Sequence, residues 1–255
     1  MKITIVTVAY NSAKTIKDTI ESVLSQTYKN YEYIIVDGKS KDNTLDIVKE
    51  YEPRFEGRLR WISEPDKGIY DAMNKGISMA TGEVVGILNS DDIFYDENVL
   101  ETIVNAFEQQ NCDSVFGNLQ FVKENDLNTV VRIWKGSPYK KGAFLKGWHP
   151  AHPTFYVKRS VYEQYGLFDI SLDISADIEL MLRFIEKYNI STYYIDRNII
   201  KMRMGGESTR SISNIIKANK NCLKAFEKNN LKPAPFYVIR KLIPKFLGVL
   251  KARLK

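Results

Sequence analysis

Short apolar runs alternate with amphipathic stretches in the first part of the chain. The runs are rich in Val and Ile and predict buried strands over Ile3–Ala9, Tyr31–Val36, Leu59–Ser63 and Val84–Leu88. The stretches between them repeat their apolar residues at helical spacing and predict helices from about Ala13 to Ser25, from Asp42 or Asn43 past Tyr51, and from Ile69 to Ala80. This order predicts a parallel sheet with helices on both faces, a Rossmann-like half.

The second half of the chain is less regular. Residues 135–153 are rich in Gly, Lys and Pro, which indicates a loop. A helix over Ser175–Tyr188 is predicted to have Ser175 as its cap. The other predicted elements are helices over Asn98–Gln110, Ser160–Tyr165 and Ile212–Asn229 and strands over Ser114–Phe121, Val130–Trp134, Thr154–Val157 and Thr192–Asp196.

The size and composition are those of an ordinary globular protein. The 255 residues suffice for one large domain or a domain with an appendage, and 44% of them are hydrophobic and 27% charged. The formal net charge of +6 comes from the end of the chain, because from Lys228 onward there are eight Lys and Arg and no Asp or Glu. The part before it has 29 basic residues against 31 acidic ones, so a nucleic-acid-binding surface is not expected.

Residues 236–255 combine apolar and basic positions at helical spacing. Leu242 and Phe246 fall on one side of the predicted helix and Lys245 on the other. Such a basic amphipathic helix is typical of a segment that lies on an anionic membrane surface. The alternative is a helix that packs on the body of the protein or on a second subunit, and Pro244 would kink the helix in either case.

The cysteines and the N-terminus favour a cytoplasmic protein. Cys112 and Cys222 match no metal-binding spacing, and so few thiols indicate a reducing compartment. The N-terminal apolar run alternates with Thr, which predicts a strand rather than a signal peptide. No stretch is apolar for long enough to cross a bilayer, so we expect any membrane contact to be peripheral, on the inner face.

Polar residues follow each of the four predicted strands at its carboxyl end. They are Ala9-Tyr10-Asn11, Asp37-Gly38, Asp66-Lys67-Gly68 and Asn89-Ser90-Asp91-Asp92. Because ligands of open α/β sheets bind at the carboxyl ends of the strands, these segments predict a nucleotide site. Two adjacent aspartates repel each other unless a cation lies between them, and Mg²⁺ or Mn²⁺ suits oxygen ligands beside a phosphorylated substrate. The alternative for the Asp pair is a helix cap or an Asx turn.

Other nucleotide- and sugar-dependent classes lack their motifs in this chain. No G-x-G-x-x-G follows the first strand and no Gly-rich loop ends in Lys-Ser or Lys-Thr, which disfavours a dinucleotide cofactor and a P-loop NTPase. A sugar nucleotidylyltransferase would need a Gly-rich, basic N-terminal loop, which residues 9–11 do not provide. A glycosidase would need a second carboxylate placed as the acid partner.

Motifs along much of the chain closely resemble the family 2 glycosyltransferases of the GT-A fold. They are Val8 to Asn11, Ile34 to Thr44, Ala80 to Glu83 and Leu88 to Asp92, with Phe168-Asp169 and Ser175 to Arg183 similar to the acceptor-side segment of that family. Residues 64–76 are similar to its bacterial exopolysaccharide branch, of the colanic-acid type. The resemblance covers about residues 1–210.

The resemblance implies an α/β protein of the GT-A fold, with a mostly parallel central sheet flanked by helices and with C-terminal helices. Residues 1–118 would bind the nucleotide-sugar, residues 119–210 would bind the acceptor and carry the catalytic base, and residues 211–255 would form the C-terminal helices. The implied activity is inverting, metal-dependent transfer of a sugar, from a UDP-sugar above all, to a glycan or polyprenyl-linked acceptor in cell-surface polysaccharide synthesis. The alternative is a catalytically silent sugar- or lipid-binding subunit.

The resemblance also implies roles for single residues. Asp91 would bind the Mn²⁺ or Mg²⁺ ion that bridges the diphosphate. Asp177 would be the general base, although an acid in the first turn of a helix is an ordinary feature. Contacts with the base, ribose, phosphates and sugar of the donor are expected from Ala9, Tyr10, Asn11, Asp37, Asp66, Lys67, Lys75, Asn89 and Ser90.

Three positions depart from the pattern of the family. Asn89 replaces the first acid of its D-x-D motif, Ala176 replaces a glutamate beside the base, and Met73 replaces a frequent arginine. Lys67 or Lys75 would then supply the missing donor contact.

Residues of the 135–153 loop and of the predicted 175–188 helix are expected on the acceptor side. Trp148 would stack on a sugar ring, although packing is the commoner role of tryptophan. His149 and His152 lack further ligands for a zinc site and would line the acceptor, with plain solvent exposure as the alternative. Glu179 is the second candidate for the base.

Overall fold

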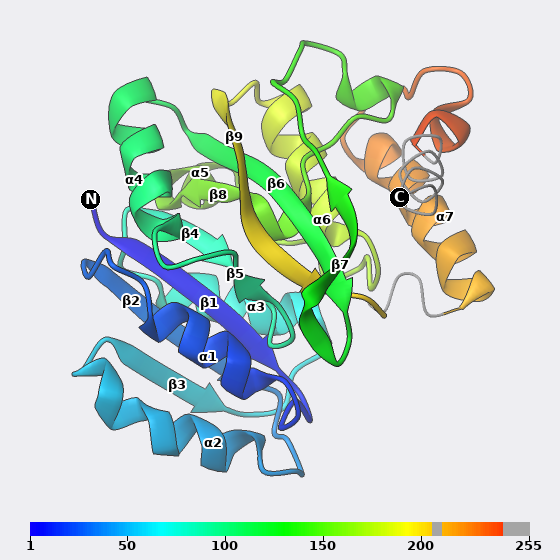
Figure 1. Cartoon of the computed structure of the whole chain (residues 1–255). Coiled ribbons are helices and arrows are strands. Elements are labelled where there is room, and N and C mark those ends of the chain that lie inside the picture. The colour runs from blue at the N-terminus through cyan, green and yellow to red at the C-terminus, as the bar shows by residue number, and fades with distance from the viewer. Residues whose placement is uncertain (206–210, 242–255) are drawn as a thin grey trace.

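The computed structural model describes residues 1–205 and 211–241. The strands are β1 (Ile3–Ala9), β2 (Tyr31–Asp37), β3 (Leu59–Ser63), β4 (Val84–Ile87), β5 (Ile93–Phe94), β6 (Ser114–Lys123), β7 (Asp126–Trp134), β8 (Tyr156–Lys158) and β9 (Thr192–Arg203). The helices are α1 (Ile16–Leu24), α2 (Thr44–Tyr51), α3 (Ile69–Met79), α4 (Val99–Gln110), α5 (Arg159–Tyr165), α6 (Ala176–Leu182) and α7 (Ile212–Lys228) (Figure 1).

One sheet organises the described part of the chain. Its strand order is β3-β2-β1-β4-β8-β6-β9-β5, and β7 pairs with β6. Strands β1 to β4 are parallel, which confirms the predicted Rossmann-like half. Beyond β4 the sheet is mixed, because β8 runs antiparallel to both β4 and β6 while β9 runs parallel to β6.

The central strands are apolar throughout because both faces of the sheet are covered. All seven residues of β1 are buried, and alternate residues of the strand enter different core clusters, Ile5 with the α1 and α4 side and Val6 with the α3 side. Gly86 in β4 has no room for a side chain, since a Cβ there would lie 2.0 Å from Cε1 of Tyr156. The close packing of β8 against β4 therefore depends on that glycine.

The start of one predicted helix differs from the structure and that of another is confirmed. Helix α1 begins at Ile16, later than predicted, because Asn11 has a φ of 51° and the chain turns on the Ser12 carbonyl before the helix starts. Ser175 is the N-cap residue of α6, as predicted, but its φ is 72° and its hydroxyl makes no capping hydrogen bond. That hydroxyl instead donates to the Ala218 carbonyl at 3.4 Å.

Strand β9 continues to Arg203, well beyond its predicted end at Asp196. It pairs with β6 along its length and also with the two-residue strand β5, which is too short to have a recognisable alternating pattern. Ile93 of β5 lies opposite Lys201 in antiparallel register. Continuing this register brings Arg203 beside Asp91, so the end of β9 becomes a wall of the loop after β4.

The two expected halves share the same sheet. The expected division at residue 118 falls inside β6, which the β8 strand connects to β4. Residues 237–241 are helical, and the Tyr237 ring packs against Phe226 of α7 at 4.8 Å between ring centroids. The rest of the predicted amphipathic segment, residues 242–255, lies outside the described residues. Among the described helices, none has the length and apolar character needed to span a membrane.

Candidate active site

The ends of β1, β2 and β3 meet at one edge of the sheet. Gly38 lies between the other two, because a Cβ on it would be 2.5 Å from Oδ2 of Asp66 and 3.3 Å from Cδ2 of Tyr10. The Tyr10 side chain is 61% exposed, so its ring is open to a ligand. Asn11 has a structural task, since its Oδ1 accepts a hydrogen bond from the Lys41 amide at 2.8 Å. The structure thus brings the predicted residues of the first three strand ends together.

Asp37 is the buried centre of this group. It is 1% exposed, and its carboxylate accepts hydrogen bonds from the amide and hydroxyl of Ser40 and from the Ser63 hydroxyl, the last at 2.6 Å. A carboxylate can accept about four hydrogen bonds, so the three from Ser40 and Ser63 leave room for one more donor. Ser40 and Ser63 are neighbours of Asp37 that the sequence did not single out.

Of the two predicted lysines, Lys67 lies on the loop between β3 and α3 and Lys75 lies on α3, from where it reaches back to that loop. Lys75 is fully engaged there, because its ammonium contacts Oε1 of Glu64 at 2.9 Å, the Pro65 carbonyl at 2.7 Å and Oδ2 of Asp71 at 3.7 Å. Lys67 has an exposed side chain, and its amide donates to Asp71 at 3.0 Å. Lys75 holds the loop in shape, which leaves Lys67 as the available lysine of the two.

The loop after β4 turns back on itself and buries one of its two aspartates. Asp92 is 0% exposed, and its Oδ2 accepts a hydrogen bond from Nδ2 of Asn89 at 3.2 Å. Burial and the neighbouring charge of Asp91 raise the pKa of Asp92 well above its usual range. Ser90 points toward β1, with its hydroxyl 2.8 Å from that of Ser12. Asn89 therefore supports the loop, and Ser90 joins it to the first strand end.

Asp91 is mostly buried, and the side chains of Arg203 and His152 interact with it electrostatically. Burial raises the pKa of Asp91 above its ordinary value, and a backbone hydrogen bond, Arg203 and His152 oppose this only in part. Arg203 is itself 6% exposed and pairs with Asp18 of α1. The hydrophobic pattern does not single out Arg203, because it lies past the predicted end of its strand.

The donor atoms of this loop suit a divalent cation. Oδ1 of Asn89 and Oδ1 of Asp92 are buried without a hydrogen-bond partner next to Asp91. Unpaired carboxylate and amide oxygens are the ligands that Mg²⁺ and Mn²⁺ prefer, and a cation would offset the cost of burying two carboxyl groups. The described residues contain no group of three or more His, Cys, Asp or Glu side chains that could hold a metal ion. The oxygen set therefore fits such an ion only if a ligand such as a diphosphate completes its coordination.

Asp177 lies in the first turn of α6 and is held from two sides. The Tyr70 hydroxyl donates to its Oδ1 at 3.1 Å, and Nδ1 of His152 lies 3.1 Å from its Oδ2. Burial would raise the pKa of Asp177, but the charge of His152, the Tyr70 hydrogen bond and the charge of His149 outweigh it and lower that pKa below its usual value. Asp177 is consequently ionised at neutral pH.

His152 connects the two aspartates on which the sequence prediction depends. It begins a 3-10 turn, residues 152–154, that packs against β4 and α6, and its charge acts on both Asp91 and Asp177. Tyr70, which the sequence did not single out, fixes the other side of Asp177 and stacks on Phe168 with 5.5 Å between ring centroids. One imidazole thus contacts the carboxylate of Asp177 and influences the pKa of Asp91, although the two aspartates lie on distant chain segments.

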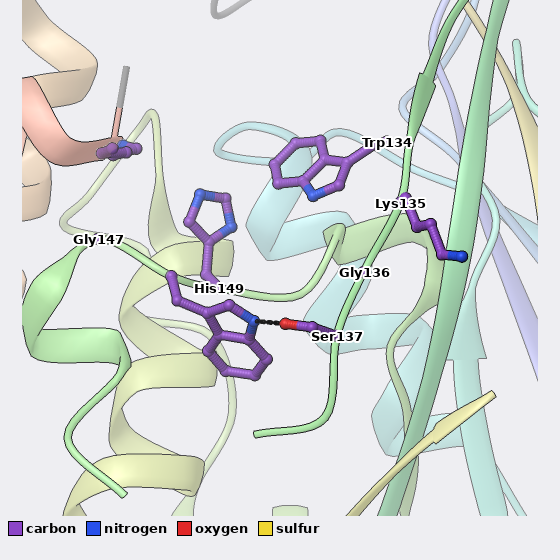
Figure 2. A pocket seen from close by; sticks show the side chains of 8 residues that line it. Trp134, Lys135, Gly136, Ser137, Gly147 and His149 are labelled. Carbon is purple, nitrogen blue, oxygen red and sulfur yellow. Dashed lines mark hydrogen bonds between the residues drawn. The ribbon is translucent and has the colours of Figure 1, made fainter. Parts of the chain in front are cut away.

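Trp148 and His149 line a hollow next to this group. Its lining includes Trp134, Trp148 and His149. Figure 2 shows the Lys135 side chain directed away from Trp134 and His149, and its ammonium lies 3.5 Å from Oδ2 of Asp196. The hollow has about 420 Å³ of empty space, including its open mouth. The Trp148 indole donates to Ser137 at 3.0 Å and is packed by Phe116 and Phe144, so its orientation is fixed.

Glu179 takes a structural role in place of the acceptor contact expected of it. It is 3% exposed, and its carboxylate accepts hydrogen bonds from Arg183 at 2.9 and 3.2 Å and from Asn229 at 2.9 Å. These bonds join α6 to the end of α7. Ala176, where the resembling family has a glutamate, is 0% exposed in the core.

Comparison with known proteins supports the fold and the family. The family model described as glycosyl transferase family 2 matches residues 4–166. An uncharacterized glycosyltransferase of Mycobacterium tuberculosis is 30% identical over 183 residues, which are 71% of this chain and 68% of that protein. The glycosyltransferase EpsE of Bacillus subtilis is 29% identical over 230 residues, which are 87% and 82% of the two chains.

Solved structures of glycosyltransferases share the fold at low sequence identity. The first 349 residues of TarS from Staphylococcus aureus, in complex with UDP-GlcNAc, match 95% of this chain and 73% of that one, with a TM-score of 0.72 and 18% identity. This chain spans 43% of full-length TarS. A mannosyltransferase of Pyrobaculum calidifontis, in complex with GDP-Man and Mn²⁺, matches 98% of this chain and 68% of that one, with a TM-score of 0.66 and 20% identity. The chain has the GT-A fold and belongs to glycosyl transferase family 2.

Proposed function

We propose that this glycosyltransferase transfers a sugar, with inversion, from a nucleotide-sugar to a glycan or polyprenyl-linked acceptor. The observation that carries the proposal is that His152 contacts Asp177 at 3.1 Å and also interacts electrostatically with Asp91, the aspartate after β4. A UDP-sugar is the donor we favour, because the TarS structure similar to this chain binds UDP-GlcNAc. The similar mannosyltransferase binds GDP-Man, so the test also includes a guanosine-diphosphate donor.

The first three strand ends would bind the nucleoside. The exposed Tyr10 ring offers a stacking face for the base, and the remaining acceptor position of Asp37 suits an N–H of that base. Asp66 lies next to both and would accept from a ribose hydroxyl. Lys67, whose side chain is exposed on the following loop, would approach the phosphates.

The loop after β4 would hold the diphosphate end of the donor. Asp91 would bind Mn²⁺ or Mg²⁺, with Oδ1 of Asn89 as a further oxygen at the same place. When bound, such an ion offsets the negative charge that grows on the leaving diphosphate. Arg203 adds a fixed positive charge on the far side of the loop, and Ser90 would contact the ribose or the sugar.

The acceptor would approach from the side of Asp177. Its hydroxyl must lose a proton as it attacks the anomeric carbon, and the Asp177–His152 group would take that proton on the side of the sugar away from the diphosphate at Asp91. Attack from the face opposite the leaving group inverts the configuration of that carbon. Trp148 and His149 would form the wall that receives the acceptor sugar.

The biological setting we propose is the synthesis of a cell-surface polysaccharide. The similarity to EpsE and the residues 64–76 that resemble the exopolysaccharide branch of the family support it. An acceptor carried on a polyprenyl lipid would bring the enzyme to the inner face of the membrane, where residues 236–255 would contact anionic lipid.

The test measures nucleotide release from a panel of UDP-sugars and GDP-mannose with Mn²⁺ present. We expect the wild type to hydrolyse one donor slowly, and Asp91→Ala and Asp177→Asn each to lose about 100-fold or more in rate. Asp46→Asn, on the exposed face of α2, is the matched control and keeps the wild-type rate. Near wild-type rates in both site variants contradict the proposal, and UDP binding without any turnover supports the silent subunit instead.

A further inference from the structure

The hydrogen bond between His152 and Asp177 fixes which nitrogen of the imidazole is free. Asp177 is ionised and can only accept, so the hydrogen in the 3.1 Å contact belongs to Nδ1 of His152. In the neutral ring the lone pair is then on Nε2, at the other side of the imidazole. In many hydrolases a carboxylate orients a histidine in this way, and the histidine then acts as the general base.

Asp177 is less suited to take the proton itself. Both of its oxygens are already bonded, Oδ1 to Tyr70 and Oδ2 to His152, and its side chain is 18% exposed against 34% for that of His152. A charged His152 lowers the pKa of Asp177, and beside a neutral His152 the hydrogen bonds from the Tyr70 hydroxyl and from Nδ1–H still stabilise the carboxylate, which makes it a weaker base. An acceptor hydroxyl therefore reaches the imidazole more readily than the carboxylate.

We propose that Nε2 of His152 takes the proton of the acceptor hydroxyl and that Asp177 acts through His152 as its positioning residue. The inference rests on the proposed glycosyl transfer and refines it. As the O–H bond breaks, its electron pair forms the bond from the acceptor oxygen to the anomeric carbon. The bond from that carbon to the diphosphate breaks, its electrons leave with the nucleoside diphosphate, and the imidazolium later releases the proton to water.

The surroundings favour the imidazolium that forms in this step. The 3-10 turn of His152 packs against β4, β6, β9 and α6. The ionisable groups from these directions that interact with His152 or its partner are Asp91 after β4, Asp177 on α6, Tyr70 on α3 and His149 on the same loop. Asp177 attracts a positive charge on the ring through the 3.1 Å contact and His149 repels it, while the charge of Asp91 would be taken up by the ion in the proposed donor complex. The transferred proton is thus stabilised above all by Asp177.

The test compares three variants on the donor that the wild type hydrolyses fastest, with water as the acceptor. His152→Gly is expected to lose about 100-fold in kcat, and added imidazole is expected to restore part of that loss. His152→Gln keeps a donor toward Asp177 but has no basic nitrogen, so it should be as slow as His152→Gly. Asp177→Asn should also be slow, but imidazole should not accelerate it, because its own imidazole is still present.

Two results would overturn the inference. One is a His152→Gln variant within about threefold of the wild-type kcat, since the glutamine supplies only positioning; the other is a His152→Gly loss that imidazole leaves unchanged. UDP binding by calorimetry, expected to be the same in all variants, shows that each has folded. A wild type that hydrolyses no donor counts against the proposed function itself, whereas an active wild type with unaffected His152 variants counts against this inference alone.

Discussion

A charge on Asp92, in the loop after β4, is electrostatically unfavourable. The residue is fully buried beside Asp91, and the neutral amide of Asn89, which donates to its Oδ2 at 3.2 Å, cannot neutralise its charge. Its pKa is therefore well above its usual range. The folded chain keeps a proton on Asp92 that the unfolded chain releases, so the contribution of this group to stability is complete below the ordinary pKa of aspartate and declines as the pH rises above it.

Replacing Asp92 with asparagine should remove this decline. The free energy of unfolding of the wild type is expected to fall as the pH rises above about 4, and that of Asp92→Asn to fall less, because the amide does not ionise. Urea unfolding over a series of pH values measures the two slopes. Asp46→Asn, an exposed aspartate of α2, is the control and should follow the wild type. Equal slopes for Asp92→Asn and wild type would mean that Asp92 ionises normally.

At the scale of elements, the pairing of β5 with β9 completes the site. The two-residue strand β5 directly follows Asp92 and lies antiparallel to the end of β9, which brings Arg203 beside the aspartates. Arg203 also pairs with Asp18 on α1 and donates to the Glu124 carbonyl at 3.1 Å. One arginine thus joins β9, α1 and the β6–β7 turn around the loop.

Arg203→Met should therefore destabilise the fold more than the loss of an ordinary surface ion pair. We expect a loss of about 2 kcal/mol in the free energy of unfolding, less than for a fully buried pair because Asp18 is 43% exposed. Arg197→Met, on the same strand, is the matched control. Arg197 is 37% exposed in its pair with Asp96, so its loss should cost at most about 1 kcal/mol. If chemical denaturation gives equal losses in the free energy of unfolding for Arg203→Met and Arg197→Met, Arg203 contributes no more than an ordinary surface ion pair.

The elements that the sequence predicted best are those with the strongest burial. The sequence predicts strands β1 to β4 well because both faces of this part of the sheet are covered, so these strands are rich in apolar residues along their length. The site was predicted only where a residue follows such a strand, as Asp91 does. Tyr70, Arg203 and the contact of His152 with Asp177 were not, because each depends on chain segments that are far apart in sequence and meet only through the sheet.

At the scale of the whole molecule, one continuous sheet carries both the proposed donor side and the proposed acceptor side of the site. Strand β8 connects β4 to β6, and the loop before β8 brings His152 to α6. Helix α7 and the helical residues 237–241 pack next to α6, where the Glu179 network joins α6 to α7 and Lys241 donates to the Cys222 thiol at 2.9 Å. The chain beyond Lys241 therefore starts from a fixed point on α7.

That anchor makes the membrane prediction for the C-terminal segment testable in the full-length protein. Removal of residues 242–255 takes away Lys245, Lys251, Arg253 and Lys255, each worth about 1 kcal/mol near an anionic surface. Sedimentation with phosphatidylglycerol vesicles should show binding of the full chain that weakens in high salt, and little binding of the truncated chain. Phosphatidylcholine vesicles are the control and should bind neither.

A variant in which these four residues become glutamine separates charge from apolar burial. It keeps the length and the leucines of the segment but removes its positive charges, so it should lose vesicle binding. It should retain hydrolysis of the donor, since all the residues of the proposed site lie before residue 204. If the segment instead packs on a second copy of the chain, the full-length protein will sediment as a dimer and the truncated one as a monomer, with no dependence on lipid. The two outcomes assign the basic segment either to a membrane surface or to a subunit interface.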